Sequence, residues 1–336
     1  MYPPGAPEPI DLVLQGGGVK GIALVGAVDR LLARFQVQRV AGTSAGAIVA
    51  SLVAAGYTRD ELRAAMMALP YNEVRDRVLP VPLLGEVAGF FASDGLYRGD
   101  FIEEWVAKHL AEKGVHTFAD LRLEPDDGAD PLLYADDHAY KLVVTATDIT
   151  RGRGLRLPWD YRDAFGLEPD KQSVAEAVRM SLSIPLYFVP RELVDTRSGK
   201  VSRIVDGGVM SNFPVELFDR QDGQPPRWPT IGAGIIPDLP GADSTLVPGL
   251  PTNLPGAFGV LEATVATAIV GHDQTYLAQP RNAERVFRAG TDSVGVVDFN
   301  IKKHEKEQLV INGENAADGF LRAWNWEKYL GRFFPL

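Results

Sequence analysis

The sequence predicts a three-layer α/β fold with a mostly parallel central sheet. Two short apolar segments of strand type, at residues 10–14 and 39–41, are each followed by a glycine-rich turn and then by apolar residues at helical spacing. Two strand–turn–helix units so close together are typical of a parallel sheet with helices packed on its faces. A chain of 336 residues is long enough to bury such a core without a disulfide.

The remaining elements follow from the same periodicities. Apolar residues at helical spacing predict N-terminal helices over residues 22–35, 48–56 and 58–69. Thr58 and Glu61 form a capping box at the start of the third of these helices. Later apolar runs predict strands over residues 141–145, 201–205 and 230–236. Further helices are predicted over residues 174–182, 257–278 and 303–330, the last interrupted around Asn312 and Gly313.

We interpret residues 1–336 as a single domain. Its motif-bearing core covers about residues 10–236, and residues 237–336 form a C-terminal extension whose role the sequence leaves open. Two segments, residues 71–96 and 122–140, have the character of insertions. The first contains apolar residues punctuated by prolines, which is typical of a lid over a binding site. Ordinary packing of a long loop over the core explains this composition equally well.

The composition excludes several classes of function. Lys and Arg number 34 against 44 Asp and Glu, so the net charge is −10, and no long run of one sign occurs. Nucleic-acid binding and permanent attachment to an anionic membrane both need clustered basic residues, which are missing here. The chain contains no cysteine, which excludes disulfides, thiolate metal sites and a cysteine nucleophile.

The sequence also gives an expectation for the cellular compartment. The residues before Pro9 have no basic start and no apolar stretch, unlike a secretory signal. The longest uncharged stretch, residues 244–261, is interrupted by three prolines and is a poor membrane-spanning helix. We expect a cytoplasmic protein whose contact with a membrane surface is transient, local and apolar.

Residues 42–46, with the sequence GTSAG, fit the G-x-S-x-G pattern of a nucleophile elbow. The serine of such an elbow stands on a sharp turn that exposes its hydroxyl, while Gly42 and Gly46 remove side chains that would collide with the flanking strand and helix. The following helix directs free N–H groups at the site, which favours an oxyanion. Small-residue turns also fit the pattern, but the strand–turn–helix context indicates that Ser44 is a nucleophile.

The glycine-rich loop at residues 16–21, with the sequence GGGVKG, allows two readings because it also fits the dinucleotide pattern G-x-G-x-x-G. A Rossmann-type oxidoreductase needs an acidic residue at the end of the second strand, but residues 36–41 contain none. A Walker-type loop is excluded because no Ser or Thr follows Lys20. We therefore interpret the backbone N–H groups of Gly16, Gly17 and Gly18 as an oxyanion hole.

Two further residues of this loop need a separate interpretation. Gly21 completes the glycine pattern at the start of the helix. Lys20 is either a positive neighbour for an anionic head group or a helix-start lysine with a structural partner, and the second role is the more common one.

A serine nucleophile needs a base, and Asp206 is the strongest candidate. None of the five histidines lies in a glycine-rich or strand-end setting, although His272 is the hardest of them to dismiss. Asp206 ends a predicted strand and is followed by Gly207 and Gly208, although an aspartate at such a turn also serves as a turn former. A free Asp is less basic than a His by about 3.5 kcal/mol. We therefore expect a desolvated Asp206 within hydrogen-bond reach of Ser44.

Taken together, these motifs resemble the patatin-like phospholipase family. The glycine loop, the serine elbow and the D-G-G motif at residues 206–208 occur in the order typical of that family. The segments 179–185 and 212–214 are also similar to family motifs, and the resemblance covers about residues 10–236. It implies that Ser44 is the nucleophile, Asp206 the base and the glycine loop the oxyanion hole.

The resemblance also implies an activity. The substrate would be a phospholipid or another acyl lipid, cleaved at an acyl ester bond through an acyl-enzyme, without a metal or another cofactor. Three alternatives stay open: acyl transfer to an acceptor other than water, a Rossmann-type oxidoreductase, and a binding or storage protein with a dormant elbow. A regulatory ligand or partner that acts through the C-terminal extension is a further hypothesis.

Overall fold

The computed structural model describes residues 7–76, 95–124, 138–236, 277–291, 294 and 299–335. Almost all of the expected helix 257–278 lies outside the described residues. The same holds for most of the lid candidate, residues 77–94, and for residues 125–137 of the second insertion. The predictions for these segments therefore stay predictions.

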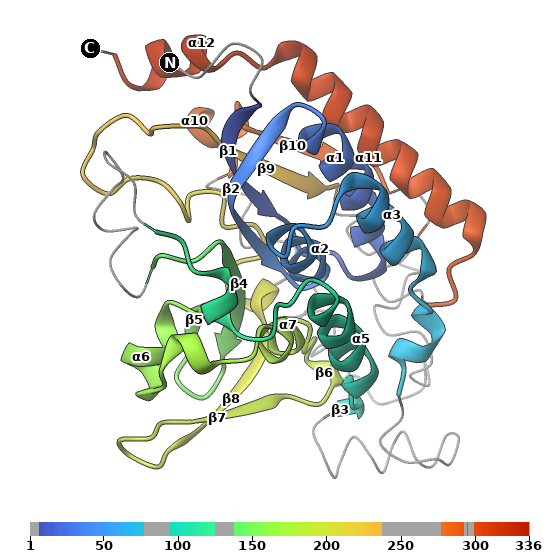
Figure 1. Cartoon of the computed structure of the whole chain (residues 1–336), viewed down its shortest axis with the longest axis vertical. Helices are drawn as coiled ribbons and strands as arrows, with labels where there is room; N and C mark the ends of the chain where they lie inside the picture. Colours follow the sequence, from blue (N-terminus) through green and yellow to red (C-terminus); the bar gives the residue numbers. More distant parts are fainter. Residues whose placement is uncertain are drawn as a thin grey trace, which may run out of the picture.

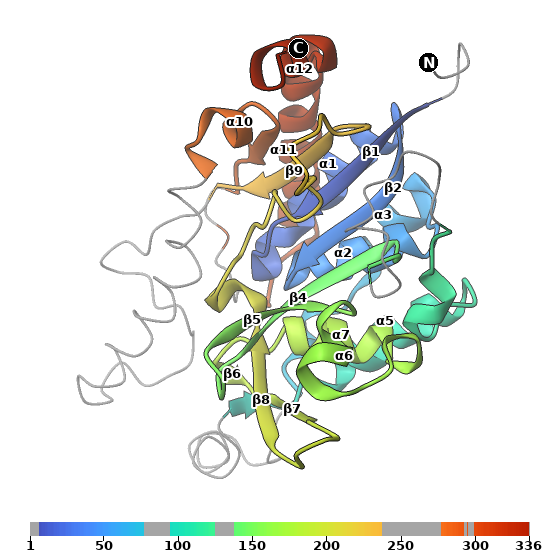
Figure 2. The ribbon, with the colours of Figure 1, turned by 90° about the vertical axis from the view of Figure 1, so that its left-hand side faces the viewer.

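In the described part of the chain, eight strands form one mixed sheet in the order β10-β9-β1-β2-β4-β8-β7, with β5 paired to β4 beside this path (Figures 1 and 2). Their bounds are β1 Glu8–Leu14, β2 Phe35–Thr43, β4 Leu142–Asp148, β5 Arg153–Leu157, β7 Arg191–Val194, β8 Val201–Asp206, β9 Thr230–Ile235 and β10 Val286–Ala289. The pairings from β10 to β4 are parallel, whereas β5, β7 and β8 are joined by antiparallel pairings. A separate two-stranded sheet joins β3 Gly95–Tyr97 and β6 Leu186–Phe188.

Helices flank the sheet, and α1, α2, α3, α5 and α11 lie on one side of it in both views (Figures 1 and 2). The helices of the described residues are α1 Ile22–Leu32, α2 Ala45–Ala54, α3 Arg59–Ala68, α5 Asp100–Ala111, α6 Asp160–Phe165, α7 Val174–Ser181, α10 Pro280–Ala283, α11 Lys303–Ala323 and α12 Trp326–Phe333. The α2 helix consists of small and apolar residues all round, and it is buried along its whole length. The predicted α/β fold with a mostly parallel sheet is confirmed.

Strand β4 brings the ends of two other strands together. Both β2 and β5 pair with residues 144 and 145 of β4, so these two strands lie on opposite edges of β4. Both β5 and β8 pair with residues 146–148 of β4, so β8 lies on the edge opposite β5, which is the edge that β2 occupies. On that edge β2 runs parallel to β4 and ends with Thr43 opposite Thr145. β8 runs antiparallel to β4 and ends with Asp206 opposite Ala146. The carboxyl ends of β2 and β8 therefore meet at two consecutive residues of β4.

One predicted helix end and one predicted helix interruption are wrong. The first predicted helix ends at Leu32, and Phe35 is already the first residue of β2. Phe35 is buried as a strand residue, and its position happened to match the apolar spacing of the helix. The C-terminal helix α11 runs without interruption through Gly313 to Ala323. Gly313 is buried there against α1, and a Cβ atom at this position would lie 1.9 Å from the carbonyl oxygen of Ala23. This glycine marks a close helix crossing rather than a helix break.

The described residues contain no helix that is both long and apolar enough to span a membrane.

Candidate active site

Ser44 occupies the sharp turn between β2 and α2 that its sequence context predicts. Its φ of 51° and ψ of −125° are rare for a residue with a side chain, so the surrounding structure must hold this conformation. The flanking glycines are required by close backbone approaches. A Cβ at Gly42 would lie 2.4 Å from the carbonyl oxygen of Gly46, and a Cβ at Gly46 would lie 2.5 Å from that of Leu14.

Asp206 is the last residue of β8, and it caps the 3₁₀ turn Gly207–Val209 that follows. Its Oδ1 atom accepts a hydrogen bond from Gly208 N at 2.8 Å. A Cβ at Gly207 would lie 2.6 Å from both the backbone oxygen and Oγ1 of Thr145, so the turn has no room for a side chain there. The D-G-G motif therefore fixes the Oδ1 atom of Asp206 and does not bind the Oδ2 atom.

Burial raises the pKa of Asp206 from 3.8 to about 7, because the charged carboxylate is removed from water. Hydrogen bonding by the Gly208 amide and by the Ser44 side chain acts in the opposite direction and lowers this pKa. The Oδ2 atom is buried and has no hydrogen bond of normal geometry among the described residues. The Ser44 side chain is nevertheless close enough to the carboxylate to lower its pKa.

The glycine loop lies beside Ser44 and is fastened by Asn212. The amide of Gly16 donates to the carbonyl oxygen of Asn212 at 3.1 Å, and Asn212 Nδ2 donates to the carbonyl oxygen of Gly16 at 3.2 Å. A Cβ at Gly16 would lie 3.2 Å from the Cβ of Ser44. Since the Gly16 amide is already engaged, the expected set of oxyanion donors reduces to Gly17 and Gly18.

The amides of Gly17 and Gly18 stand at the beginning of the 3₁₀ helix Gly18–Gly21, where a helix provides no internal partners for N–H groups. Gly18 has a φ of 54°, a conformation that glycine adopts without strain. A Cβ at Gly17 would lie 2.0 Å from Cδ1 of Ile235, so this position also has no room for a side chain. Lys20 is buried within the protein, which favours its structural role over contact with a head group.

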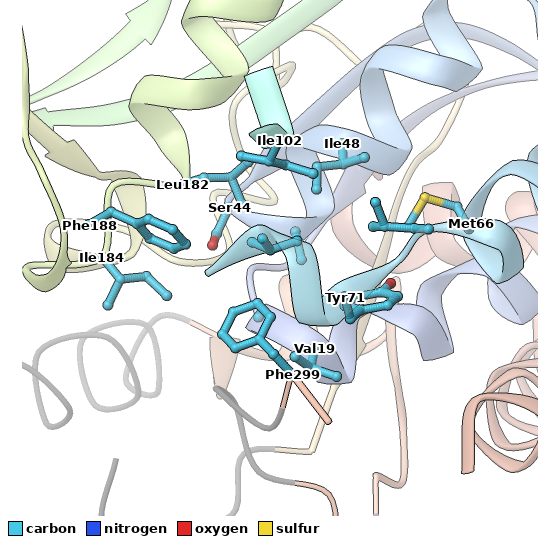
Figure 3. A pocket seen from close by; sticks show the side chains of 15 residues that line it. Val19, Ser44, Ile48, Met66, Tyr71, Ile102, Leu182, Ile184, Phe188 and Phe299 are labelled. Atoms are coloured by element: carbon cyan, nitrogen blue, oxygen red, sulfur yellow. The ribbon is translucent and has the colours of Figure 1, made fainter. Parts of the chain in front are cut away.

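An apolar pocket opens beside the Ser44 hydroxyl (Figure 3). Its walls come from the glycine loop, α2, α3, α5 and the segment after α7, and they include Val19, Ile48, Met66, Leu69, Tyr71, Ile102, Leu182, Ile184, Phe188 and Phe299. The lining residues of the described part of the chain contain no histidine and no charged side chain. The pocket can therefore accept an apolar chain that is attached to a group reacting at Ser44.

Among the described residues, no histidine lines the pocket beside Ser44. His109 lies on α5, where its Nδ1 pairs with the carbonyl oxygen of Trp105 at 2.8 Å, and His272 lies outside the described residues. The described part of the chain holds no cluster of three or more His, Cys, Asp or Glu side chains that could bind a metal.

The sequence reasoning missed three residues that contact the candidate dyad or the glycine loop. Ser181 and Ser183 bind the backbone of Ser44 and Asp206, respectively, and Asn212 fastens Gly16 as described above. One sequence feature could have indicated these residues. They lie in the segments 179–185 and 212–214, both of which are similar to family motifs.

Comparison with known proteins identifies the family of this chain. Residues 12–219 match the family described as patatin-like phospholipase. The chain therefore belongs to the patatin-like phospholipase family, and this membership makes it a lipid hydrolase.

Three relatives illustrate the range of similarity. The chain is 36% identical over 321 residues to the uncharacterized protein YqhO of Bacillus subtilis (strain 168), covering 94% of this chain and 99% of that one. It is 26% identical over 243 residues to the cUMP-AMP-activated phospholipase of Escherichia coli, covering 68% and 65%. The crystal structure of VipD from Legionella pneumophila has a TM-score of 0.50 at 20% identity, covering 94% and 67%, a likeness that concerns the fold alone.

Proposed function

We propose that this protein hydrolyses an acyl ester bond of a phospholipid or related lipid, with Ser44 as nucleophile and Asp206 as base. The observation that carries the proposal is the meeting of β2 and β8 on one edge of β4, which puts a strained serine beside a buried carboxylate. The pKa of Asp206, raised to about 7 by burial, supports the role of a base near neutral pH.

The chemistry follows from these positions. Asp206 takes the proton from the Ser44 hydroxyl while Oγ attacks the carbonyl carbon of the ester. The amides of Gly17 and Gly18 stabilise the oxyanion of the tetrahedral intermediate, which collapses when Asp206 returns the proton to the leaving alcohol. Water then attacks the acyl-enzyme and gives its proton to Asp206. The intermediate releases the acid and restores the serine hydroxyl with that proton.

The apolar pocket supports an acyl chain as the part of the substrate that binds beside Ser44. Its walls carry no charged side chain among the described residues, so an apolar chain can be removed from water there without burying an unpaired charge. Because Lys20 is buried, we do not assign it to the head group. The acyl chain thus contributes the main share of the binding energy in this proposal.

The test compares the wild-type protein with Ser44→Ala on mixed phospholipids, with mass spectrometry of the released fatty acids and lysolipids. Loss of the hydroxyl should abolish hydrolysis, because the acyl-enzyme can no longer form. Equal thermal melting of the two proteins would serve as the folding control. Hydrolysis by Ser44→Ala at the wild-type rate would refute the assignment, and acyl groups found on an added alcohol rather than as free acid would indicate a transferase.

A further inference from the structure

One short segment at the end of α7 holds the backbone of both members of the candidate dyad. Ser44 N donates to Ser181 Oγ at 2.8 Å, and Asp206 N donates to the carbonyl oxygen of Ser183 at 2.9 Å. Ser181 and Ser183 are completely buried. Ser44 and Asp206 lie far apart in the chain. Their backbone amides nevertheless bind two residues, Ser181 and Ser183, that are separated by one residue only.

Ser44 needs such an external partner. It stands between the end of β2 and the first residue of α2, and an amide at the N-cap position takes no part in the hydrogen bonds of the helix. Its rare φ and ψ persist where neighbouring groups hold them. Ser181 Oγ supplies the acceptor at this turn. Because the Ser44 amide is engaged with Ser181, it is not a free donor for the oxyanion.

Asp206 has a similar need at the end of its strand. The pairing of β7 with β8 ends at Arg191 opposite Ile204, so β7 does not reach Asp206. The carbonyl oxygen of Ser183 takes up the Asp206 amide beyond the last residue pair. The intervening residue Leu182 and the next residue Ile184 line the apolar pocket. The segment thus alternates between residues that bind the backbone of Ser44 or Asp206 and residues that line the apolar pocket.

A buried arginine fixes this segment in place. Arg179 is 1% exposed, and its Nη1 donates to Ser183 Oγ at 2.6 Å. Its Nη2 donates to the carbonyl oxygens of Val189, at 3.0 Å, and Arg98, the residues that directly follow β6 and β3. Burial lowers the pKa of Arg179 to about 10, so the guanidinium is still charged at neutral pH. It connects the small two-stranded sheet to the segment that carries the serines.

We propose that Ser181 is a positioning residue for the nucleophile, within a segment of residues 179–183 that keeps Ser44 and Asp206 in register. The proposal rests on the proposed function, since it assigns Ser181 to the same reaction. Ser181 acts through the backbone of Ser44 and does not touch the substrate. Its removal should therefore slow the chemical step and leave substrate binding unchanged.

The test compares Ser181→Ala with Ser51→Ala as a matched control. Ser51 is also a completely buried serine, and its hydroxyl donates to the carbonyl oxygen of Ile48 at 2.8 Å inside α2, away from the dyad. An unsatisfied buried amide costs about 1–3 kcal/mol. If this cost raises the free energy of the transition state and not that of the bound substrate, kcat of Ser181→Ala should fall by about 5- to 150-fold with KM unchanged. Ser51→Ala should keep both constants.

A second measurement does not depend on activity. Amide hydrogen exchange followed by mass spectrometry should show faster exchange in the peptide containing Ser44 for Ser181→Ala and unchanged exchange for Ser51→Ala. A wild-type kcat for Ser181→Ala, or unchanged exchange at Ser44, would overturn the positioning role. If the wild-type protein hydrolyses no lipid, the proposed function fails, and the exchange comparison alone then decides the positioning role.

Discussion

Burial makes the side chain of Asp206 much more basic than a carboxylate in water. A carboxylate in water has a pKa near 3.9, about 2.6 below that of histidine, so it accepts a serine proton poorly. In this fold the side chain is 1% exposed, and desolvation raises its pKa to about 7. Desolvation therefore removes the deficit in proton affinity that a Ser–Asp pair would otherwise have, which is what the proposed mechanism requires of Asp206.

The raised pKa of Asp206 predicts the pH dependence of catalysis. The base must be ionised, so kcat/KM should fall about tenfold per pH unit well below about pH 7 and reach a plateau above it. Initial rates on a soluble ester across this range would measure the profile. Asp206→Asn should lower kcat by about 10²- to 10⁴-fold and abolish this pH limb. A wild-type rate that is independent of pH between about 5 and 8 would rule out Asp206 as the base.

At the scale of elements, the crossing of α1 and α11 joins the C-terminal extension to the core. Gly26 on α1 and Gly313 on α11 lie where the two helix backbones approach, and a Cβ at either would lie 1.9 Å from a carbonyl oxygen of the other helix. The buried face of α11 is completed by Leu309, Val310 and Ala317. This part of the extension therefore contributes to the packing that supports the first strand–turn–helix unit.

Alanine substitutions at two glycines of α11 should have opposite effects on stability. Gly313→Ala forces α1 and α11 apart, and we expect the free energy of unfolding to fall by about 1–3 kcal/mol or more. At Gly319 the nearest atom to a new Cβ is 3.8 Å away, so Gly319→Ala should add about 0.5–1 kcal/mol through helix propensity. Urea unfolding of both variants measures the difference. Equal effects at the two positions would contradict the close crossing.

The elements of this fold differ in how far local sequence patterns predict them. The strand–turn–helix units and the elbow could be predicted because periodicity and glycine spacing act over a few residues. The continuity of α11 could not, because Gly313 resembles a helix breaker until α1 is placed against it. The hydrogen bond between Ser181 and Ser44 is hidden for the same reason, since a buried serine near the end of a helix has no distinctive local pattern.

At the scale of the whole molecule, the carboxylate of Asp206 couples activity to global stability. A group whose pKa is higher in the folded than in the unfolded state stabilises the fold when protonated, and this stability is lost as pH rises through the folded pKa. Raising a carboxyl pKa from 3.8 to about 7 corresponds to about 4 kcal/mol. The contribution of Asp206 to the free energy of unfolding is therefore expected to be lower at neutral pH than at about pH 4, because its buried carboxyl ionises.

Asp206→Asn should accordingly gain stability relative to the wild-type protein as pH increases. The difference in unfolding free energy between the two proteins should rise by up to about 4 kcal/mol between about pH 4 and pH 7 and stay constant above that. Other titrating groups cancel in this difference, so denaturant unfolding at several pH values isolates the effect of Asp206. A difference that does not change with pH would show that the folded protein does not raise the pKa of this carboxyl.

The sequence by itself determined the fold class, the serine turn and the aspartate turn, because each depends on short-range steric and periodic constraints. The tertiary structure decided how these parts cooperate. The shared edge of β4 brings the ends of β2 and β8 together, Ser181 and Ser183 hold the two turns, and burial sets the pKa of Asp206. Register, desolvation and hydrogen bonds between distant segments arise when the chain is packed, so no local pattern encodes them on its own.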